Sequence, residues 1–155
     1  MEKIKLNDTV EFSAGSAPGP INSRQRILVV DDDRDIRQLC VEVLAASGYV
    51  VEAAKDGAAG WDALQASRYD LLITDNKMPR MTGIEMIAKL RAAKMKLPII
   101  MATGFLPIHQ FIRRPWLQPD VAMERPFTND DLLEVVNKIL RPTATPNRLL
   151  PGPPP

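Results

Sequence analysis

Acidic side chains stand directly after two aliphatic runs of this sequence. Asp31 and Asp32 follow the segment 26–30, whose last four residues are aliphatic, and Asp75 follows the segment 70–74, which has aliphatic residues at 71–73. Such runs are typical of strands buried on both faces of a parallel sheet, and these sheets place their chemistry at the carboxyl ends of the strands. Three carboxylates brought together there cannot all stay ionised without a cation. Because the candidate ligands are hard oxygen atoms with no His or Cys nearby, Mg²⁺ is the predicted partner.

The elements that must position these carboxylates alternate along the chain. The apolar patterns predict strands at 26–30, 49–54, 70–74, 97–102 and 119–123, and helices at 34–46, 57–67, 83–93 and 128–140. This alternation predicts an α/β fold with a doubly wound five-stranded parallel sheet. The first and third strands are neighbours in such a sheet, so Asp31, Asp32 and Asp75 should converge within several ångströms. The segment 103–118 is irregular, because its prolines leave room for only about two helical turns.

Composition predicts one folded domain between two tails. The chain has 155 residues, which suits a single domain with a sizeable core. We expect that domain at 25–141, preceded by a flexible tail at 1–24 that mixes charge with Ser, Gly and Pro. The Pro-rich segment 142–155 should form an extended C-terminal tail.

The charge balance and the cysteine content indicate which partners the protein binds and in which cellular compartment it is found. The 20 basic and 19 acidic residues leave a net charge of +1, so no global field favours nucleic acid or an anionic membrane. No run resembles a signal sequence or a membrane span. The single cysteine, Cys40, excludes an internal disulfide framework and has the spacing of a helix core face. We therefore expect a cytoplasmic protein that binds neither nucleic acid nor membrane.

The motifs at the strand ends resemble the receiver domain of bacterial two-component response regulators. The resemblance covers roughly residues 26–140. It rests on Val-Val-Asp-Asp at 29–32, Asp75 followed three residues on by Met-Pro, Ala-Thr-Gly at 102–104, and a basic residue before Pro-Phe at 126–127. Each motif alone is weak, but their order on the right strand ends is strong evidence. The resemblance implies a flavodoxin-like fold with strand order 2-1-3-4-5.

The resemblance assigns a role to each acidic residue. The family's phosphoacceptor falls on Asp75, and its acidic metal-binding pair falls on Asp31 and Asp32. The backbone carbonyl of Lys77 falls where the family supplies another metal ligand. The implied cofactor is Mg²⁺, which would let a carboxylate attack phosphorus by screening the repulsion between anions.

The remaining implied site residues include two departures from the family pattern. Thr103 falls on the hydroxyl residue that contacts the phosphoryl group, and Gly104 on the small residue after it. Arg125 stands where the family has lysine, and arginine is also cationic but longer and planar. Ala122 stands where the family has an aromatic switch residue. We expect the Arg125–Pro126 bond to be cis, as in the family, and we expect no cationic side chain to be forced between the three carboxylates.

The implied function is that of a stand-alone, single-domain response regulator. It would accept a phosphoryl group from a histidine kinase or phosphotransfer protein and signal by protein–protein interaction or phosphorelay, without being an enzyme. The alternatives are a pseudo-receiver that docks proteins independently of phosphorylation, and a Mg²⁺-dependent phosphohydrolase with an aspartyl nucleophile. The hydrolase ranks last, because Lys77 stands where such enzymes usually have a second acid.

The output surface is expected at 103–127 and the last helix, either for another protein or for a phosphorylation-dependent dimer. A short helix cannot bury Ile108, Phe111, Ile112 and Trp116 on one face, so apolar surface should stay exposed. The alternative is that Trp116 folds back and plugs the sheet edge.

Overall fold

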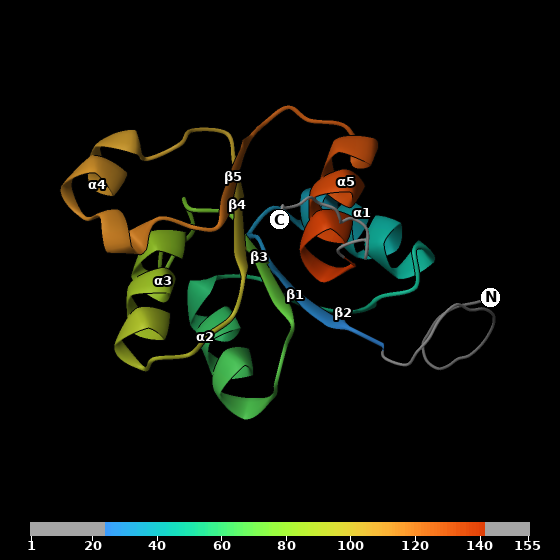
Figure 1. Cartoon of the computed structure of the whole chain (residues 1–155), viewed down its shortest axis with the longest axis horizontal. Helices are drawn as coiled ribbons and strands as arrows, with labels where there is room; N and C mark the ends of the chain where they lie inside the picture. Colours follow the sequence, from blue (N-terminus) through green and yellow to red (C-terminus); the bar gives the residue numbers. More distant parts are fainter. Residues whose placement is uncertain (1–23, 142–155) are drawn as a thin grey trace, which may run out of the picture.

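The described part of the chain is built around five parallel strands. The computed structural model describes residues 24–141. In chain order the elements are β1 (Arg26–Val30), α1 (Arg34–Ala46), β2 (Val50–Ala54), α2 (Gly57–Ala66), β3 (Leu71–Thr74), α3 (Gly83–Ala92), β4 (Ile99–Thr103), α4 (Ile108–Arg113), the short 3₁₀ helix η2 (Pro115–Leu117), β5 (Val121–Glu124) and α5 (Asn129–Leu140). The strand order is β2-β1-β3-β4-β5, so the predicted doubly wound sheet is confirmed (Figure 1). The predicted C-terminal tail, and the N-terminal tail up to residue 23, lie outside the described residues.

Helices cover both faces of the sheet. Figure 1 shows α1 and α5 on one side and α2 and α3 on the other. The α1/α5 side packs on Ile27, Val29, Ile73 and Ile100, among others, and the opposite side packs on Leu28, Val30, Leu72 and Met101, among others. Every residue of β3 and β4 is buried, whereas β5 alternates between half-buried and exposed positions as expected of an edge strand. Because β3 and β4 are buried along their whole length, packing in the core holds their carboxyl ends in place.

Side-chain caps place the helix starts close to the predicted positions. Asp33 accepts hydrogen bonds from the N–H groups of Asp35 and Ile36 at the start of α1. Thr82 and Thr128 each form a reciprocal capping box at the starts of α3 and α5. Such caps satisfy N–H groups that have no partner inside the helix. They also fix where the loops before α1, α3 and α5 end.

The last strand starts later than predicted, at Val121 instead of residue 119. Pro119 has no N–H to donate to a strand ladder. Asp120 bonds twice to Ile99, because its N–H donates to the Ile99 carbonyl and its carboxylate accepts from the Ile99 N–H. Between residues 24 and 141, no helix is long and apolar enough to cross a bilayer.

Candidate functional site

The three predicted carboxylates meet at the carboxyl edge of β1 and β3. The two strands are parallel neighbours, and Val30 pairs with Thr74, so Asp31 and Asp75 each stand one residue past the pairing. One carboxylate oxygen from each of Asp31, Asp32 and Asp75 lies within 4.8 Å of the other two. Asp31 and Asp75 are buried and Asp32 is exposed. The expected convergence is confirmed, while the roles of these residues stay predictions.

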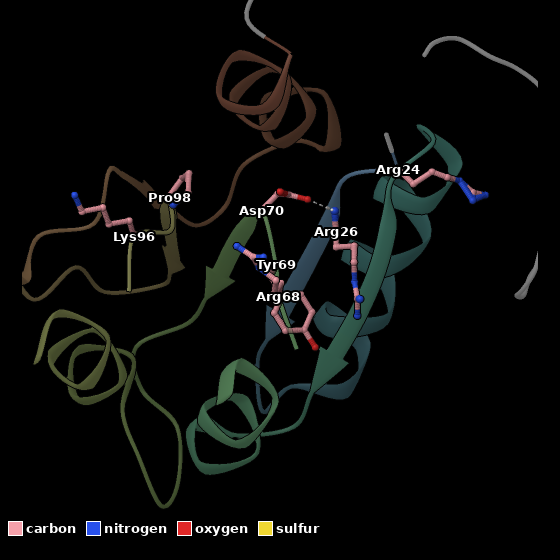
Figure 2. Close-up of a pocket in the computed structure, with 7 residues that line it drawn as sticks. All are labelled: Arg24, Arg26, Arg68, Tyr69, Asp70, Lys96 and Pro98. Atoms are coloured by element: carbon pink, nitrogen blue, oxygen red, sulfur yellow. Dashed lines mark hydrogen bonds between the residues drawn. The ribbon is translucent and has the colours of Figure 1, made fainter. Parts of the chain in front are cut away.

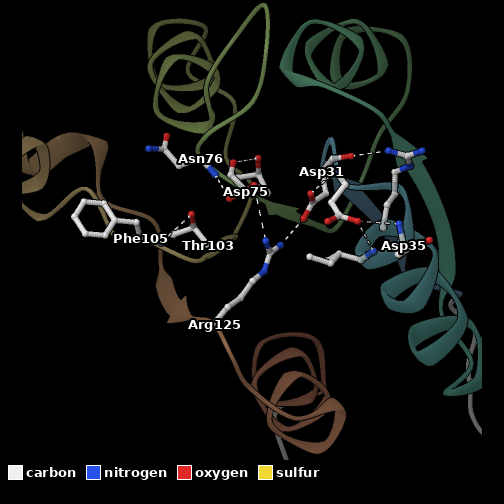
Figure 3. Close-up of polar contacts among 11 residues, drawn as sticks. Asp31, Asp35, Asp75, Asn76, Thr103, Phe105 and Arg125 are labelled. Carbon is white, nitrogen blue, oxygen red and sulfur yellow. Dashed lines mark hydrogen bonds and ion pairs between the residues drawn. The ribbon is translucent and has the colours of Figure 1, made fainter.

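A cation from the last strand reaches into this cluster. Arg125 follows β5, and its backbone N–H donates to the carbonyl of Thr103 at 2.9 Å. The Arg125 Nη2 donates to Asp31 Oδ2, and Nη1 lies 3.9 Å from Asp75 Oδ2 (Figure 3). The expectation that no cation stands between the carboxylates is therefore wrong. The physical reason is the length of the arginine side chain, which extends from the end of β5 to the carboxylates that follow β1 and β3. The Arg125–Pro126 bond is cis, as predicted.

Asp31 accepts hydrogen bonds through both its side chain and its backbone carbonyl. Its Oδ1 accepts from the N–H of Asp33 at 2.9 Å, and its carbonyl accepts from Arg37 Nη1 at 2.7 Å. Burial raises the pKa of the Asp31 carboxyl above its ordinary value of 3.8, although the Asp33 N–H and the Arg125 guanidinium both act to lower it. Burial without a counter-charge would favour the protonated acid, and the guanidinium favours the carboxylate.

Asp75 sits in a loop that is tied to the start of α3. Its Oδ1 accepts from the Asn76 N–H at 2.7 Å. The Asn76 side-chain oxygen accepts from the Ile84 N–H at 3.0 Å, and the Asn76 carbonyl accepts from the Gly83 N–H at 2.9 Å. These contacts hold the backbone that follows the carboxylate. The sequence interpretation missed Asn76 and Gly83, and the only signal was an Asn directly after the acid with a Gly at the next helix start.

The other predicted site residues lie around this centre. Thr103 is buried, and its hydroxyl oxygen accepts from the Phe105 N–H at 3.5 Å. Figure 3 shows Thr103 on the β4 side of Asp75, with the Phe105 ring pointing away from the carboxylates. Lys77 and Gly104 are exposed residues, and a Cβ added at Gly104 would meet nothing within 4 Å. Of these residues, only Thr103 brings a side chain beside the cluster.

A second ion pair braces the same edge and was not predicted. Asp56 is buried at the start of α2, where it accepts from the Ala59 N–H at 2.8 Å and from Arg80 Nε at 3.1 Å. The Ala59 N–H, together with Arg80, lowers the pKa of the Asp56 carboxyl despite its burial. This pair links α2 to the loop between β3 and α3. It therefore supports the site without entering it.

A shallow depression lies at the opposite, amino-terminal edge of the sheet. Figure 2 shows the residues that line it, which are Arg24, Arg26, Arg68, Tyr69, Asp70, Lys96 and Pro98. Asp70 accepts from the backbone N–H of Arg26 at 2.8 Å. The Arg26 guanidinium pairs with Glu52 at 2.5 Å. Two of the charged residues that line the depression, Arg26 and Asp70, therefore already make contacts within the fold.

Comparison with known proteins agrees with this architecture. The model of the response regulator receiver domain family matches residues 27–137. Response regulator MprA from Mycobacterium avium is 36% identical over 118 residues, which are 76% of this chain and 52% of that protein. MprA from Mycobacterium tuberculosis is also 36% identical over 118 residues, covering 51% of its length. The chain spans about half the length of the curated relatives that it matches.

Solved structures show the same fold. Response regulator TrrA from Thermotoga maritima, solved in complex with Mg²⁺-BeF, is 32% identical with a TM-score of 0.65, covering 74% of this chain and 98% of that one. Chemotaxis response regulator CheY4 of Vibrio cholerae is 29% identical with a TM-score of 0.68, covering 76% of this chain and 99% of that one. On the family match and these relatives, the chain belongs to the response regulator receiver domain family.

Proposed function

We propose that Asp75 accepts a phosphoryl group from the phosphorylated histidine of a histidine kinase or phosphotransfer protein. The observation that carries this proposal is the convergence of Asp31 and Asp32 on Asp75 within 4.8 Å, at the strand edge where α/β sheets place their chemistry. Receiver domains are signalling domains, and the family match makes phosphoryl acceptance the expected chemistry.

The cluster fits a Mg²⁺ ion in its donor set. It offers three carboxylates, all hard oxygen donors, and one of them, Asp32, is open to solvent. Mg²⁺ prefers such ligands and keeps several waters, so a site with one open side suits it. We assign Asp31, Asp32, Asp75 and the backbone carbonyl of Lys77 as its ligands. When bound, the ion would screen the repulsion between the Asp75 carboxylate and the incoming phosphoryl oxygens.

The chemical step exchanges one phosphorus bond for another. A carboxylate oxygen of Asp75 attacks phosphorus and forms a P–O bond, while the P–N bond to the donor histidine breaks and its electron pair returns to the imidazole nitrogen. The protein then has to hold charge on the three remaining phosphoryl oxygens. In this proposal Thr103 donates its hydroxyl hydrogen to one of them, and Arg125 donates from its guanidinium to another.

The output surface in this proposal is the α4 surface, which we define as Phe105, Ile108, Ile112 and Trp116. These side chains are 83%, 50%, 68% and 61% exposed, so the predicted exposure is confirmed and Trp116 does not plug the sheet edge. Arg113 and Arg114 are exposed beside them, and segment 104–119 contains no Asp or Glu. An apolar partner segment flanked by acidic side chains suits this surface best.

A phosphorylation-independent docking module is the second candidate. It is favoured by the Arg125–Asp31 contact, which already neutralises part of the cluster, and by the exposed Ala122 at the position of the family's aromatic switch. In that function the α4 surface would bind its partner equally well with or without phosphorylation. The two candidates differ in whether Asp75 can be modified at all.

The first prediction tests this difference by intact mass. After incubation with Mg²⁺ and acetyl phosphate, the protein should gain the mass of one phosphoryl group, because the donor needs no protein partner. The gain should be absent in Asp75→Asn and strongly reduced in Asp32→Ala, which removes a metal ligand but leaves the nucleophile. A mass gain that persists in Asp75→Asn would place the modification elsewhere. No gain in the wild type would support the docking module, and rapid turnover with release of phosphate would support a hydrolase.

A further inference from the structure

Three basic residues from distant parts of the chain meet at the amino-terminal edge of the sheet. Arg24 precedes β1, Arg68 lies between α2 and β3, and Lys96 lies between α3 and β4. All three are exposed and line the shallow depression of Figure 2. Figure 2 shows Lys96 and Arg24 on opposite sides of the view, with Arg68 between them. We call these three residues the basic rim.

The other charged residues of the depression already have partners. The Arg26 guanidinium pairs with Glu52 and lies over the Tyr69 ring, and Asp70 accepts from the Arg26 N–H. By contrast, no ion pair joins the basic rim to any other residue in the range 24–141. Its cationic groups are therefore available to carboxylates from outside, with which they form charge-assisted hydrogen bonds.

The lining of the depression favours an acidic peptide over other ligands. Small-molecule pockets are lined mostly by apolar side chains, whereas five of the seven lining residues here are charged. Single-stranded nucleic acid stacks on exposed aromatic rings, but Tyr69 is half-buried with its ring beside Arg26. An anionic membrane also needs apolar side chains to insert, and within the described range no exposed large hydrophobic residue lines the depression.

We propose that the basic rim binds a segment of a partner protein that carries several Asp or Glu side chains. Side chains on one face of an extended peptide are about 6.6 Å apart, so successive carboxylates can meet cations from different loops. Complementary charges of this kind speed the encounter and fix its orientation. Because the basic rim is exposed, the contact weakens as salt is added.

This surface lies at the opposite edge of the sheet from Asp75. Asp70 and Asp75 stand directly before and after β3, which places them about 16 Å apart along the strand. That separation exceeds the screening length of about 10 Å at 0.1 M salt. The partner can therefore stay bound whether or not Asp75 carries a phosphoryl group. The inference goes beyond the proposed function and does not depend on it.

The test measures binding of a fluorescently labelled oligoglutamate peptide by anisotropy at low salt. The wild type is compared with Arg68→Ser/Lys96→Ser and with the matched control Arg34→Ser/Lys55→Ser. The control removes the same charges from exposed residues at the carboxyl edge, at the start of α1 and after β2. The basic-rim variant should bind about tenfold more weakly, because two exposed ion pairs are lost, and the control should match the wild type. Urea unfolding verifies that both variants fold, and Lys96→Ser alone carries the test if the double variant does not.

A second variant should change the affinity in the opposite direction. Asp70 is the one acidic residue among those that line the depression in the described part of the chain. Asp70→Asn keeps an oxygen that can accept from the Arg26 N–H but removes the negative charge. It should bind the peptide about threefold more tightly. The matched control is Asp130→Asn, an exposed acid in the first turn of α5, and it should match the wild type.

Each remaining outcome decides for or against the basic rim. Equal binding by the wild type and the basic-rim variant would overturn the proposal, and so would an equal loss in the Arg34→Ser/Lys55→Ser control. Tighter binding of a labelled oligothymidylate or of phosphatidylserine vesicles than of the peptide would assign the surface to that class of partner instead. Unchanged peptide binding in Asp75→Asn, a variant that abolishes the proposed phosphorylation, would support the independence of the two edges, and lost binding would contradict it.

Discussion

Gly83, at the start of α3, lets this helix pack closely against the backbone of Asp75. A Cβ added at Gly83 would lie 2.3 Å from the Asp75 carbonyl oxygen and 3.0 Å from the Asn76 Cα. Gly83 is the first residue of α3, where a side chain is otherwise compatible with the helix. Only a residue without a side chain therefore lets α3 approach the acidic loop so closely.

The second prediction concerns this approach. Gly83→Ala should lower the free energy of unfolding by about 2 to 3 kcal/mol, because the added methyl group forces the loop and the helix apart. It should also reduce phosphorylation of Asp75, whose backbone would be displaced. The matched control is Gly104→Ala, since a Cβ there meets nothing within 4 Å and should change stability little. Urea unfolding of both variants measures the difference, and equal stabilities would contradict the packing argument.

At the scale of elements, the segment of α4 and η2, residues 108–117, has only two buried side chains. Phe111 and Leu117 are buried in the core on the α3 side. Arg91 of α3 donates to the carbonyls of Trp116 and Gln118 at 3.0 and 2.9 Å. Segments with few buried contacts and an exposed backbone open more readily than core strands. We therefore expect this segment to open more readily than the central strands.

The third prediction follows from the link between Thr103 and Phe105. Ala122 offers no aromatic ring, so the loop after β4 has to carry the change itself. Binding of Mg²⁺ and beryllofluoride should draw Thr103 towards Asp75 and alter the position of Phe105. Hydrogen exchange should then change in residues 103–117, measured on the free protein and on the complex, with Asp75→Asn as the control. Unchanged protection with the ligands demonstrably bound would place the output surface elsewhere.

At the scale of the whole molecule, side-chain contacts at the amino-terminal edge of the sheet link β1 and β2 to the segment before β3. The Tyr69 hydroxyl donates to Glu52 at 2.5 Å, and the Arg26 guanidinium lies 5.2 Å from the centre of the Tyr69 ring. Burial, together with the Glu52 carboxylate, raises the pKa of Tyr69 from 10.0 to about 12. Folding thus favours the protonated phenol.

The fourth prediction is the pH dependence that results. Because the folded pKa is raised, this group contributes stability that is fully present below about pH 10 and is lost as the pH rises towards 12. In that window the native state binds more protons than the unfolded state, so the free energy of unfolding falls. Denaturant unfolding between pH 9 and about 12 should show a steeper fall in the wild type than in Tyr69→Phe. Burial also raises the pKa of Tyr49, so the variant should keep part of the slope.

The sequence by itself determined the fold and the identity of the acidic cluster. Aliphatic runs such as 71–73 are local signals, because a strand buried on both faces needs apolar residues along its length. The order of strands and helices then allows few topologies, and parallel strands bring their carboxyl ends to one edge. Asp31, Asp32 and Asp75 could be placed together on these grounds alone.

Only the tertiary structure decided which cation contacts the acidic cluster and which apolar residues of α4 remain exposed to solvent. Arg125 and Asp31 are 94 positions apart, and no local pattern indicates that the arginine would contact Asp31 more closely than Asp75. Likewise, the sequence shows that α4 cannot bury all its apolar residues, but the choice of Phe111 over Ile112 depends on the core it meets. Such outcomes depend on the distance between side chains from different elements, which the order of residues along the chain does not specify.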